Sequence, residues 1–316
     1  MKYAAEERPV QGALSKQLNR FAKKKERFWE LDFLRGLCVV LMILDHFMFC
    51  ISYVAPYVND VLGTGVFENS YAFAELFDES AFIESCRFIV RCMFFALCGV
   101  SCTLSKNNFF RFVPLAAVAV LINVACAVLD AAGFGGFTVI FGVFHMLASS
   151  VLAFALLDGA VSLALLLIKD NKKREAAEPF ARFLPGLCGL ALLFAFFSQW
   201  GALSSYGGLH LVSNVPASGD HAADLITGIF VETKNSAYAG TADYFPLLPW
   251  GAIVLAGSLV GRGIYHTFAK NALKPLDGAW NAGFCFIGRH AALFYLGQLV
   301  ALPALIALGG IIDFIF

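Results

Sequence analysis

Charged side chains are scarce in this sequence of 316 residues. They make up 15% of the chain, whereas hydrophobic residues make up 59%. A soluble globular domain has about a quarter of its residues charged, so the composition excludes that class. Several apolar runs reach the roughly 20 residues that a helix needs to cross a bilayer. The sequence therefore predicts an all-α fold, a polytopic bundle of transmembrane helices in contact with the lipid bilayer.

Metal-binding and nucleotide-binding motifs are also lacking. The nine cysteines show no Cys/His spacing typical of a metal site. We therefore expect no metal and interpret the cysteines as small buried side chains, with a disulfide between Cys50 and Cys86 left open. The glycines around positions 63 and 133 lack the strand–turn–helix context of a phosphate-binding loop. We expect no nucleic-acid partner.

A cleavable signal peptide is a third missing feature. Residues 1–28 are polar and basic, without a short apolar region followed by small residues at a cleavage site. We interpret them as a basic leader and the first apolar segment as a retained helix. Lys23, Lys24, Lys25 and Arg27 place the leader in the cytoplasm by the positive-inside rule. The expected location is the cytoplasmic (inner) membrane.

Lysine and arginine clusters alternate with apolar segments along the rest of the chain. Residues 36–86 contain neither, and clusters follow several later segments. The alternation predicts one transmembrane domain, residues 29–316, with about seven spans, the N-terminus in the cytoplasm and the C-terminus outside. The expected spans cover residues 33–54, 86–104, 112–130, 138–168, 184–200, 245–261 and 283–316.

Three expectations concern the shape of this bundle. Asp158-Gly159 interrupts the fourth span, so we expect its last third either to bend or to lie in the membrane interface. Residues 201–244 are expected to be a polar outer loop, long enough for a lid or a substrate rim. The last apolar stretch is either one long helix or two shorter ones, and the second case gives eight spans.

The first span carries polar residues on one face. Asp32 and Arg35 stand at its cytoplasmic entrance, and Asp45 and His46 stand toward its outer end. Arg35 and His46 fall on one stripe of the helix, about 16 Å apart along its axis. Polar groups there are costly unless they face protein or a water-filled cavity. Asp45 either orients the imidazole of His46 or pairs with another helix, and the spacing leaves both open.

The second span begins with two arginines. Arg87 lies one turn after Glu84, and an ion pair at the rim is the simpler interpretation of these two residues. Arg91 lies one turn deeper, where an arginine needs a partner or a substrate anion.

His145, Asp243 and Tyr244 lie near the outer ends of two later spans. His145 is about two turns into the fourth span, and Asp243 and Tyr244 open the sixth. Asp243 is also interpretable as a cap of its own helix, ahead of Pro246. With His46 and Arg91, these residues predict a polar outer half of the bundle.

The polar residues together suggest a route through the bundle, basic at the cytoplasmic side and rich in histidine and aspartate outside. Such a route suits the transfer of a group from an anionic donor in the cytoplasm to an acceptor at the outer face. It suits equally a proton-coupled transporter or flippase of a small anionic or glycan-linked solute. A non-catalytic membrane subunit would not need a buried His46. The residues alone do not separate enzyme from transporter.

Several stretches, in order, resemble bacterial members of the heparan-alpha-glucosaminide N-acetyltransferase catalytic-domain family. They are Arg27 with Asp32-Phe33-Leu34-Arg35-Gly36, Met42 and His46; Phe94-Phe95 with Gly99 and Ser101; Phe141-Gly142-Val143-Phe144-His145; Asp243-Tyr244-Phe245-Pro246 with Pro249-Trp250, Gly257 and Gly261-Arg262; and Gly288-Arg289-His290 with Tyr295-Leu296. The spacing of Arg35 and His46 is also similar to that in acyltransferase-3 membrane O-acetyltransferases. One position departs from the family pattern, which usually has a histidine where this chain has Gln298.

The resemblance implies a membrane acyltransferase that moves an acetyl group from cytoplasmic acetyl-CoA, the donor substrate, to an envelope sugar. The acceptor, an amine or a hydroxyl of a glycan, lies on the outer side. His46, with Asp45, is implied as catalytic, either as general base or as transient acetyl carrier. The acyl-donor side would comprise Arg35, Asp32 and Arg289. The acceptor site would comprise Arg91, Arg87, His145, Asp243 and Tyr244. The choice between N- and O-acetylation and the oligomeric state stay open.

Overall fold

The computed structural model describes residues 27–131, 133, 138–233, 238, 241 and 243–315, so almost all of the basic leader lies outside the described residues. Helices dominate this part of the chain. They are α2 (Trp29–Phe49), η1 (Cys50–Val54), α3 (Ala55–Leu62), η2 (Glu68–Ser70), α4 (Tyr71–Glu79), α5 (Ala81–Thr103), α6 (Phe109–Ala131), α7 (Val143–Leu166), α8 (Asn171–Ala181), α9 (Leu184–Gln199), α10 (His221–Phe230), η3 (Leu247–Gly251), α11 (Ala252–Tyr265), η4 (Phe268–Asn271), η5 (Lys274–Leu276), η6 (Ala279–Asn281), α12 (Ala282–Arg289) and α13 (Ala291–Ile315). Two short strands, β1 (Gly201–Ser204) and β2 (His210–Ser213), complete it.

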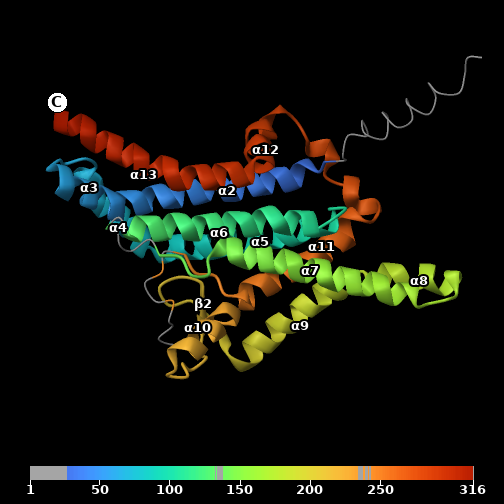
Figure 1. Cartoon of the computed structure of the whole chain (residues 1–316). Coiled ribbons are helices and arrows are strands. Elements are labelled where there is room, and N and C mark those ends of the chain that lie inside the picture. The colour runs from blue at the N-terminus through green and yellow to red at the C-terminus, as the bar shows by residue number, and fades with distance from the viewer. Residues whose placement is uncertain are drawn as a thin grey trace, which may run out of the picture.

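The long helices form one bundle. Figure 1 shows α2, α5, α6, α7 and α13 running alongside one another, with α9 crossing obliquely. The closest pairings are α5 with α11, α2 with α12, and α9 with α11. The segment around β2 and α10 lies near one end of the bundle, and α8 projects from the other (Figure 1).

Within the part of the chain that the structure describes, six helical segments are long and apolar enough to cross a membrane. They are Trp29–Leu62, Phe109–Ala131, Val143–Leu166, Asn171–Gln199, Leu247–Tyr265 and Ala291–Ile315. The predicted all-α, multi-pass fold is therefore confirmed, whereas the seven spans and the cytoplasmic N-terminus stay predictions. The helix α5, which carries Arg87 and Arg91, packs on α2 and α11 within the same bundle.

The first helix continues beyond its expected end at residue 54. The segment α2–η1–α3 is helical from Trp29 to Leu62, with a π-helical turn at Cys50–Val54. Pro56 does not stop the helix because the π-helical turn lies just before it, and such local adjustments accommodate the missing N–H group of a proline inside a membrane helix. The prediction that the helix of the first span ends at residue 54 is therefore wrong.

The interruption expected at Asp158-Gly159 does not occur, since α7 is helical through both residues. The carboxylate of Asp158 binds Arg182 at 3.1 Å and Arg262 at 3.2 Å. An aspartate with two cationic partners is tolerated in the middle of an apolar helix. Asp158 therefore belongs to an ion-pair network and does not interrupt the helix.

The segment 201–244, expected as an outer loop, has regular structure within its described residues. Strands β1 and β2 pair antiparallel, with Gly201 opposite Ser213 and Ser204 opposite His210. Helix α10 follows, and its N-cap Asp220 accepts a hydrogen bond from the backbone N–H of Ala222. Short strands of four residues give too little alternation to be recognised in a sequence.

The final apolar stretch forms two helices, one of the two alternatives that the sequence left open. The short α12 ends at Arg289, and α13 begins at Ala291. Helix α12 packs closely on α2 through two glycines. A Cβ atom on Gly36 would lie 2.0 Å from the carbonyl oxygen of Phe284, and one on Gly288 would lie 1.7 Å from that of Asp32. These residues must therefore lack side chains for the two backbones to approach.

Candidate functional site

A cavity of about 850 Å³ opens between α2, α5, the β1–β2 hairpin, the segment before α11, and α13. Its wall is largely aromatic and aliphatic, with a small set of polar side chains. The polar lining residues are Asp45, His46, Glu84, Arg87, Arg91, His210, Glu232, Asp243, Tyr244 and Tyr295. A mostly apolar pocket with few convergent polar groups is the usual form of a small-molecule site.

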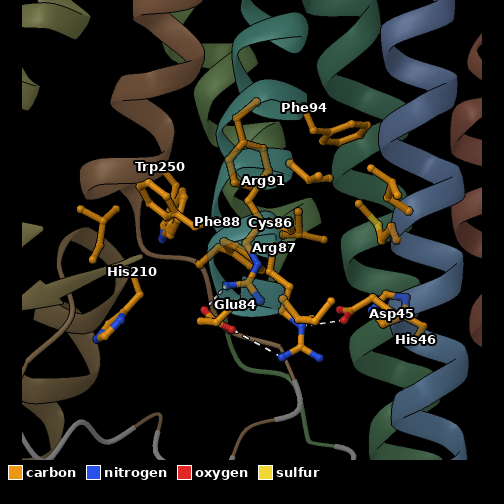
Figure 2. A pocket seen from close by; sticks show the side chains of 18 of the residues that line it. Asp45, His46, Glu84, Cys86, Arg87, Phe88, Arg91, Phe94, His210 and Trp250 are labelled. Atoms are coloured by element: carbon orange, nitrogen blue, oxygen red, sulfur yellow. Dashed lines mark hydrogen bonds and ion pairs between the residues drawn. The ribbon is translucent and has the colours of Figure 1, made fainter. Parts of the chain in front are cut away.

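Arg87 joins three carboxylates at the rim of this cavity. Its Nε atom donates to Asp45 of α2 at 2.6 Å, and its other nitrogens contact Asp78 in the last turn of α4 and Glu84 of α5. Figure 2 shows the guanidinium group between Asp45 and Glu84. The Glu84–Arg87 pair expected from the sequence is present, at 3.5 Å. Arg87 therefore holds α2, α4 and α5 together, and its charge is compensated.

Arg91 lies one turn deeper and has a weaker ion pair. Its guanidinium group is 3.7 Å from Glu84, a carboxylate that it shares with Arg87, and its side chain is 36% exposed (Figure 2). An exposed guanidinium group with a long, shared ion pair is available to a ligand anion or a sugar oxygen.

His46 contributes its ring to the cavity wall from α2. The carboxylate of the adjacent Asp45 binds Arg87, which is the second of the two alternatives left by the sequence. The Nδ1 atom of His46 is buried and has no hydrogen-bond partner among the described residues. Its ring meets Tyr295 of α13 edge to face, with centroids 6.3 Å apart.

Asp243 caps a helix, but not its own. Its carboxylate accepts a hydrogen bond at 2.8 Å from the backbone N–H of Val143, the first residue of α7. The expected cap of the following helix is thus corrected to a cap on a helix 100 residues earlier in the chain. Burial raises the pKa of the Asp243 carboxyl, against the opposing effects of the Val143 amide and the charge of Arg91.

Tyr244 is anchored by its hydroxyl group and its ring. The hydroxyl donates to the carbonyl oxygen of Gly228 in α10 at 2.7 Å, and the ring stacks on Tyr238 with centroids 4.5 Å apart. Tyr244 therefore ties the outer segment to the cavity wall.

His145 lies behind the cavity wall and is not among its lining residues. Its Nδ1 atom accepts a hydrogen bond from the backbone N–H of Gly142 at 3.2 Å. The ring lies against Phe141, with centroids 5.6 Å apart. In this conformation His145 organises the N-terminus of α7, together with Asp243.

The three residues predicted for the acyl-donor side, Asp32, Arg35 and Arg289, are not among the residues that line the cavity. Arg35 donates to Asp32 at 3.1 Å and to the hydroxyl of Ser101 in α5 at 2.8 Å. Arg289 is exposed on α12 and donates to the carbonyl oxygen of Cys285 in its own helix at 3.0 Å. The structure thus brings His46, Arg87, Arg91, Asp243 and Tyr244 together and leaves the donor-side residues at a separate place on α2 and α12.

Two polar residues of the lining were not identified from the sequence. His210 and Glu232 come from the outer segment, where only the length of the expected loop hinted at a rim. The hairpin reaches the cavity because the backbone N–H of Leu209 donates to the hydroxyl of Ser85 in α5 at 2.9 Å. Among the residues that the structure describes, no group of three or more His, Cys, Asp or Glu side chains is placed to hold a metal ion.

Comparison with known protein families shows a match over most of the chain. The model of a family described as "Heparan-alpha-glucosaminide N-acetyltransferase, catalytic" matches residues 27–169 and 186–300. The break between the two matched parts falls on α8 and its flanks. No curated protein and no solved structure matches the chain.

Proposed function

The chain belongs to the heparan-alpha-glucosaminide N-acetyltransferase catalytic family, and on this premise we propose that it transfers an acetyl group from cytoplasmic acetyl-CoA to a sugar. The acceptor is an amine or a hydroxyl group of an envelope glycan, presented on the outer side of the cytoplasmic membrane. Acetyl-CoA is the donor substrate, and the cavity receives the acceptor.

The observation that carries this proposal is the composition of the cavity wall. The family-like stretches of the sequence are far apart along the chain, yet every one of them contributes to this wall. The contributing residues are Met42 and His46, Phe94 and Phe95, Val143, Asp243 to Pro246 with Trp250, and Tyr295. Stretches that match one family and converge on one cavity support a shared chemical role for it.

In the proposed reaction His46 acts as general base. The nitrogen or oxygen of the acceptor attacks the acetyl carbonyl carbon, and its proton passes to the imidazole. A C–N or C–O bond forms, the C–S bond of the thioester breaks, and CoA leaves as a thiolate that then takes up a proton. A base aligned with the attacking atom contributes roughly 10²–10⁴-fold to such a step.

The remaining polar lining residues are proposed to hold the acceptor. Arg91, His210 and Glu232 face the cavity with groups that hydrogen-bond sugar oxygens or an amine. Trp250 and the neighbouring phenylalanines provide the apolar surface on which a sugar ring packs. Asp243 and Tyr244 support this wall through the hydrogen bonds to Val143 and Gly228.

The donor is proposed to enter at the opposite end of α2. Arg35, Asp32 and Arg289 lie there, and a distance of about 16 Å along the helix to His46 is of the order of an extended pantetheine arm. Leu41 is the first residue of α2 that lines the cavity. Delivery of the acetyl group therefore requires the helices around α2 to open a path between Arg35 and Leu41.

An acetyl-transfer assay tests the proposal. The protein, purified in detergent, is expected to release free CoA from acetyl-CoA when it is given amino sugars or other envelope sugars, and His46→Ala should abolish this release. His221→Ala is the matched control, because His221 is exposed at the start of α10 and is not among the cavity-lining residues.

Two outcomes contradict the proposal. If acetyl-CoA neither binds to the protein nor raises its thermal stability, the proposed acetyltransferase activity is contradicted. Movement of a solute across sealed vesicles without acetyl-CoA supports the transporter instead.

A further inference from the structure

Gln298 is a buried amide in a membrane-spanning helix. It lies in α13 and is only 5% exposed. Both amide atoms, Nε2 and Oε1, are buried and have no hydrogen-bond partner among the described residues. An unsatisfied amide in a low-dielectric interior is strongly unfavourable. Because buried polar groups are normally hydrogen-bonded, we expect this amide to have a partner in the functional state of the protein.

The neighbour of this amide is a second unsatisfied group. Gln298 lies beside the imidazole of His46, whose buried Nδ1 atom also has no partner among the described residues. Tyr295, one turn before Gln298 on the same face of α13, contacts the same ring. Nδ1 of His46 and the two amide atoms of Gln298 therefore lie together at the contact between α2 and α13. Within the part of the chain that the structure describes, none of the three has a partner at the distance and angles of a hydrogen bond.

The two side chains have complementary chemistry. A neutral imidazole has one N–H donor and one acceptor nitrogen, and an amide has both kinds of group. The hydrogen bond made by one ring nitrogen decides which tautomer is present at the other. The adjacent Asp45 does not supply this bond, because its carboxylate binds Arg87.

We propose that Gln298 is the residue that positions His46, by accepting the Nδ1–H of the imidazole on its Oε1 atom. Nε2 then carries a lone pair and receives the proton of the acceptor. The inference rests on the proposed function, because it assigns a partner to the base of that reaction. The opposite amide orientation would donate to Nδ1 and leave the proton on Nε2, where the ring could not act as a base.

Two variants of Gln298 test this role. Gln298→Met has nearly the same length but accepts no strong hydrogen bond, and it should lower kcat by about ten- to a hundredfold, part of the general-base contribution, with little change in KM. Gln298→Glu keeps the acceptor at the same place and should retain more activity than Gln298→Met. A carboxylate also stabilises the imidazolium form, so the acidic limb of the pH–rate profile should move to higher pH.

The pH profile must be interpreted with the other groups around the ring. The charged groups near His46 are Asp45 on its own helix and Arg87 and Arg91 on α5, and Tyr295 faces it from α13. All four are unchanged in both Gln298 variants, so a shift between the variants reports on position 298.

Asn123→Leu is the matched control, since Asn123 in α6 also has a buried amide oxygen without a partner but is not among the cavity-lining residues. It should leave kcat and the pH profile unchanged. A Gln298→Met protein that keeps the kcat and pH profile of the parent, while His46→Ala is inactive, overturns the inference but not the proposed function. Equal loss of activity in Gln298→Met and Gln298→Glu, with an unshifted profile, also overturns it. An active His46→Ala protein contradicts the proposed role of His46 itself.

Discussion

At the scale of single residues, Arg87 is the main electrostatic link of the cavity rim. It forms ion pairs with three carboxylates from α2, the end of α4, and α5, and its side chain is only 15% exposed. The rigidity of the rim therefore depends on one guanidinium group, whereas Arg91 is left available to a ligand.

We predict that Arg87→Ala destabilises the protein by about 1–3 kcal/mol, because three carboxylates lose their shared partner. Arg87→Lys should recover part of this loss, since an ammonium group keeps the charge but not the fork geometry. Thermal unfolding in detergent measures both variants. An Arg87→Ala protein as stable as the parent would show that the carboxylates are well solvated without the arginine.

Asp243 makes stability depend on pH. Burial raises the pKa of its carboxyl in the folded protein, so the unfolded chain releases this proton first, from about pH 3.9 upward. The contribution of Asp243 to stability is therefore greatest at low pH and declines as pH rises toward the raised native pKa.

We predict that Asp243→Asn reduces this decline, while its amide oxygen still accepts the N–H of Val143. Asp243→Ala should also lose the cap of α7, at a cost of about 1 kcal/mol. Unfolding midpoints recorded from about pH 4 to 7 test this, and an identical slope in the parent and in Asp243→Asn would contradict it.

The sequence identified much of the site, for a physical reason. Polar residues such as His46, Arg91 and Asp243 are conspicuous in apolar segments, because burial there requires a partner or a cavity. Which helix each residue faces depends on tertiary packing, so the pairing of Asp45 with Arg87 could not be chosen in advance. His210 escaped notice because a histidine in a polar outer segment carries no such signal.

At the scale of elements, glycines set how closely the helices pack. The contact between α2 and α12 places the backbones of Gly36 and Phe284 against each other. The pairing of α5 with α11 is similar, since a Cβ atom on Gly99 would lie 1.8 Å from the carbonyl oxygen of Val254. Several glycines of the family-like stretches are therefore packing residues.

We predict that Gly36→Ala destabilises the protein by about 1–3 kcal/mol, the usual effect of overpacking. Gly283→Ala is the matched control in the partner helix, because a Cβ atom there meets nothing within 4 Å. It should be neutral or stabilise by up to about 1 kcal/mol, as expected for alanine in a helix. Equal thermal stability of the two variants would contradict the close contact.

The elements were predicted well where a single apolar run decides the structure. The segments α6, α7 and α9 lie close to their expected spans. The sequence failed where the outcome depends on a neighbouring element. Asp158 signalled an interruption of the fourth span but is compensated by Arg182 and Arg262 within a continuous helix, and the β1–β2 hairpin is fixed in part by its contact with Ser85.

At the scale of the whole molecule, the polar residues form two centres at different places along α2. Arg35 with Asp32 and Ser101 forms the first centre, and the cavity around His46 forms the second. The sequence singled out Arg35 and His46 as polar residues on one helix, while their roles stay predictions. It could not predict that the cavity wall begins only at Leu41, because side chains from several helices determine where a cavity ends.

The helix from Trp29 to Leu62 has a consequence for the size of the acceptor. Its 34 residues span roughly 51 Å at 1.5 Å per residue, whereas the hydrocarbon core of a bilayer is about 30 Å thick. Under the predicted topology, with Trp29 at the inner interface, where tryptophan is favoured, His46 would stand roughly 26 Å above it, close to the outer water layer. The proposed glycan acceptor would then present only its end to the cavity while the rest of it stays in water, so we predict that its chain length does not limit what this site accepts.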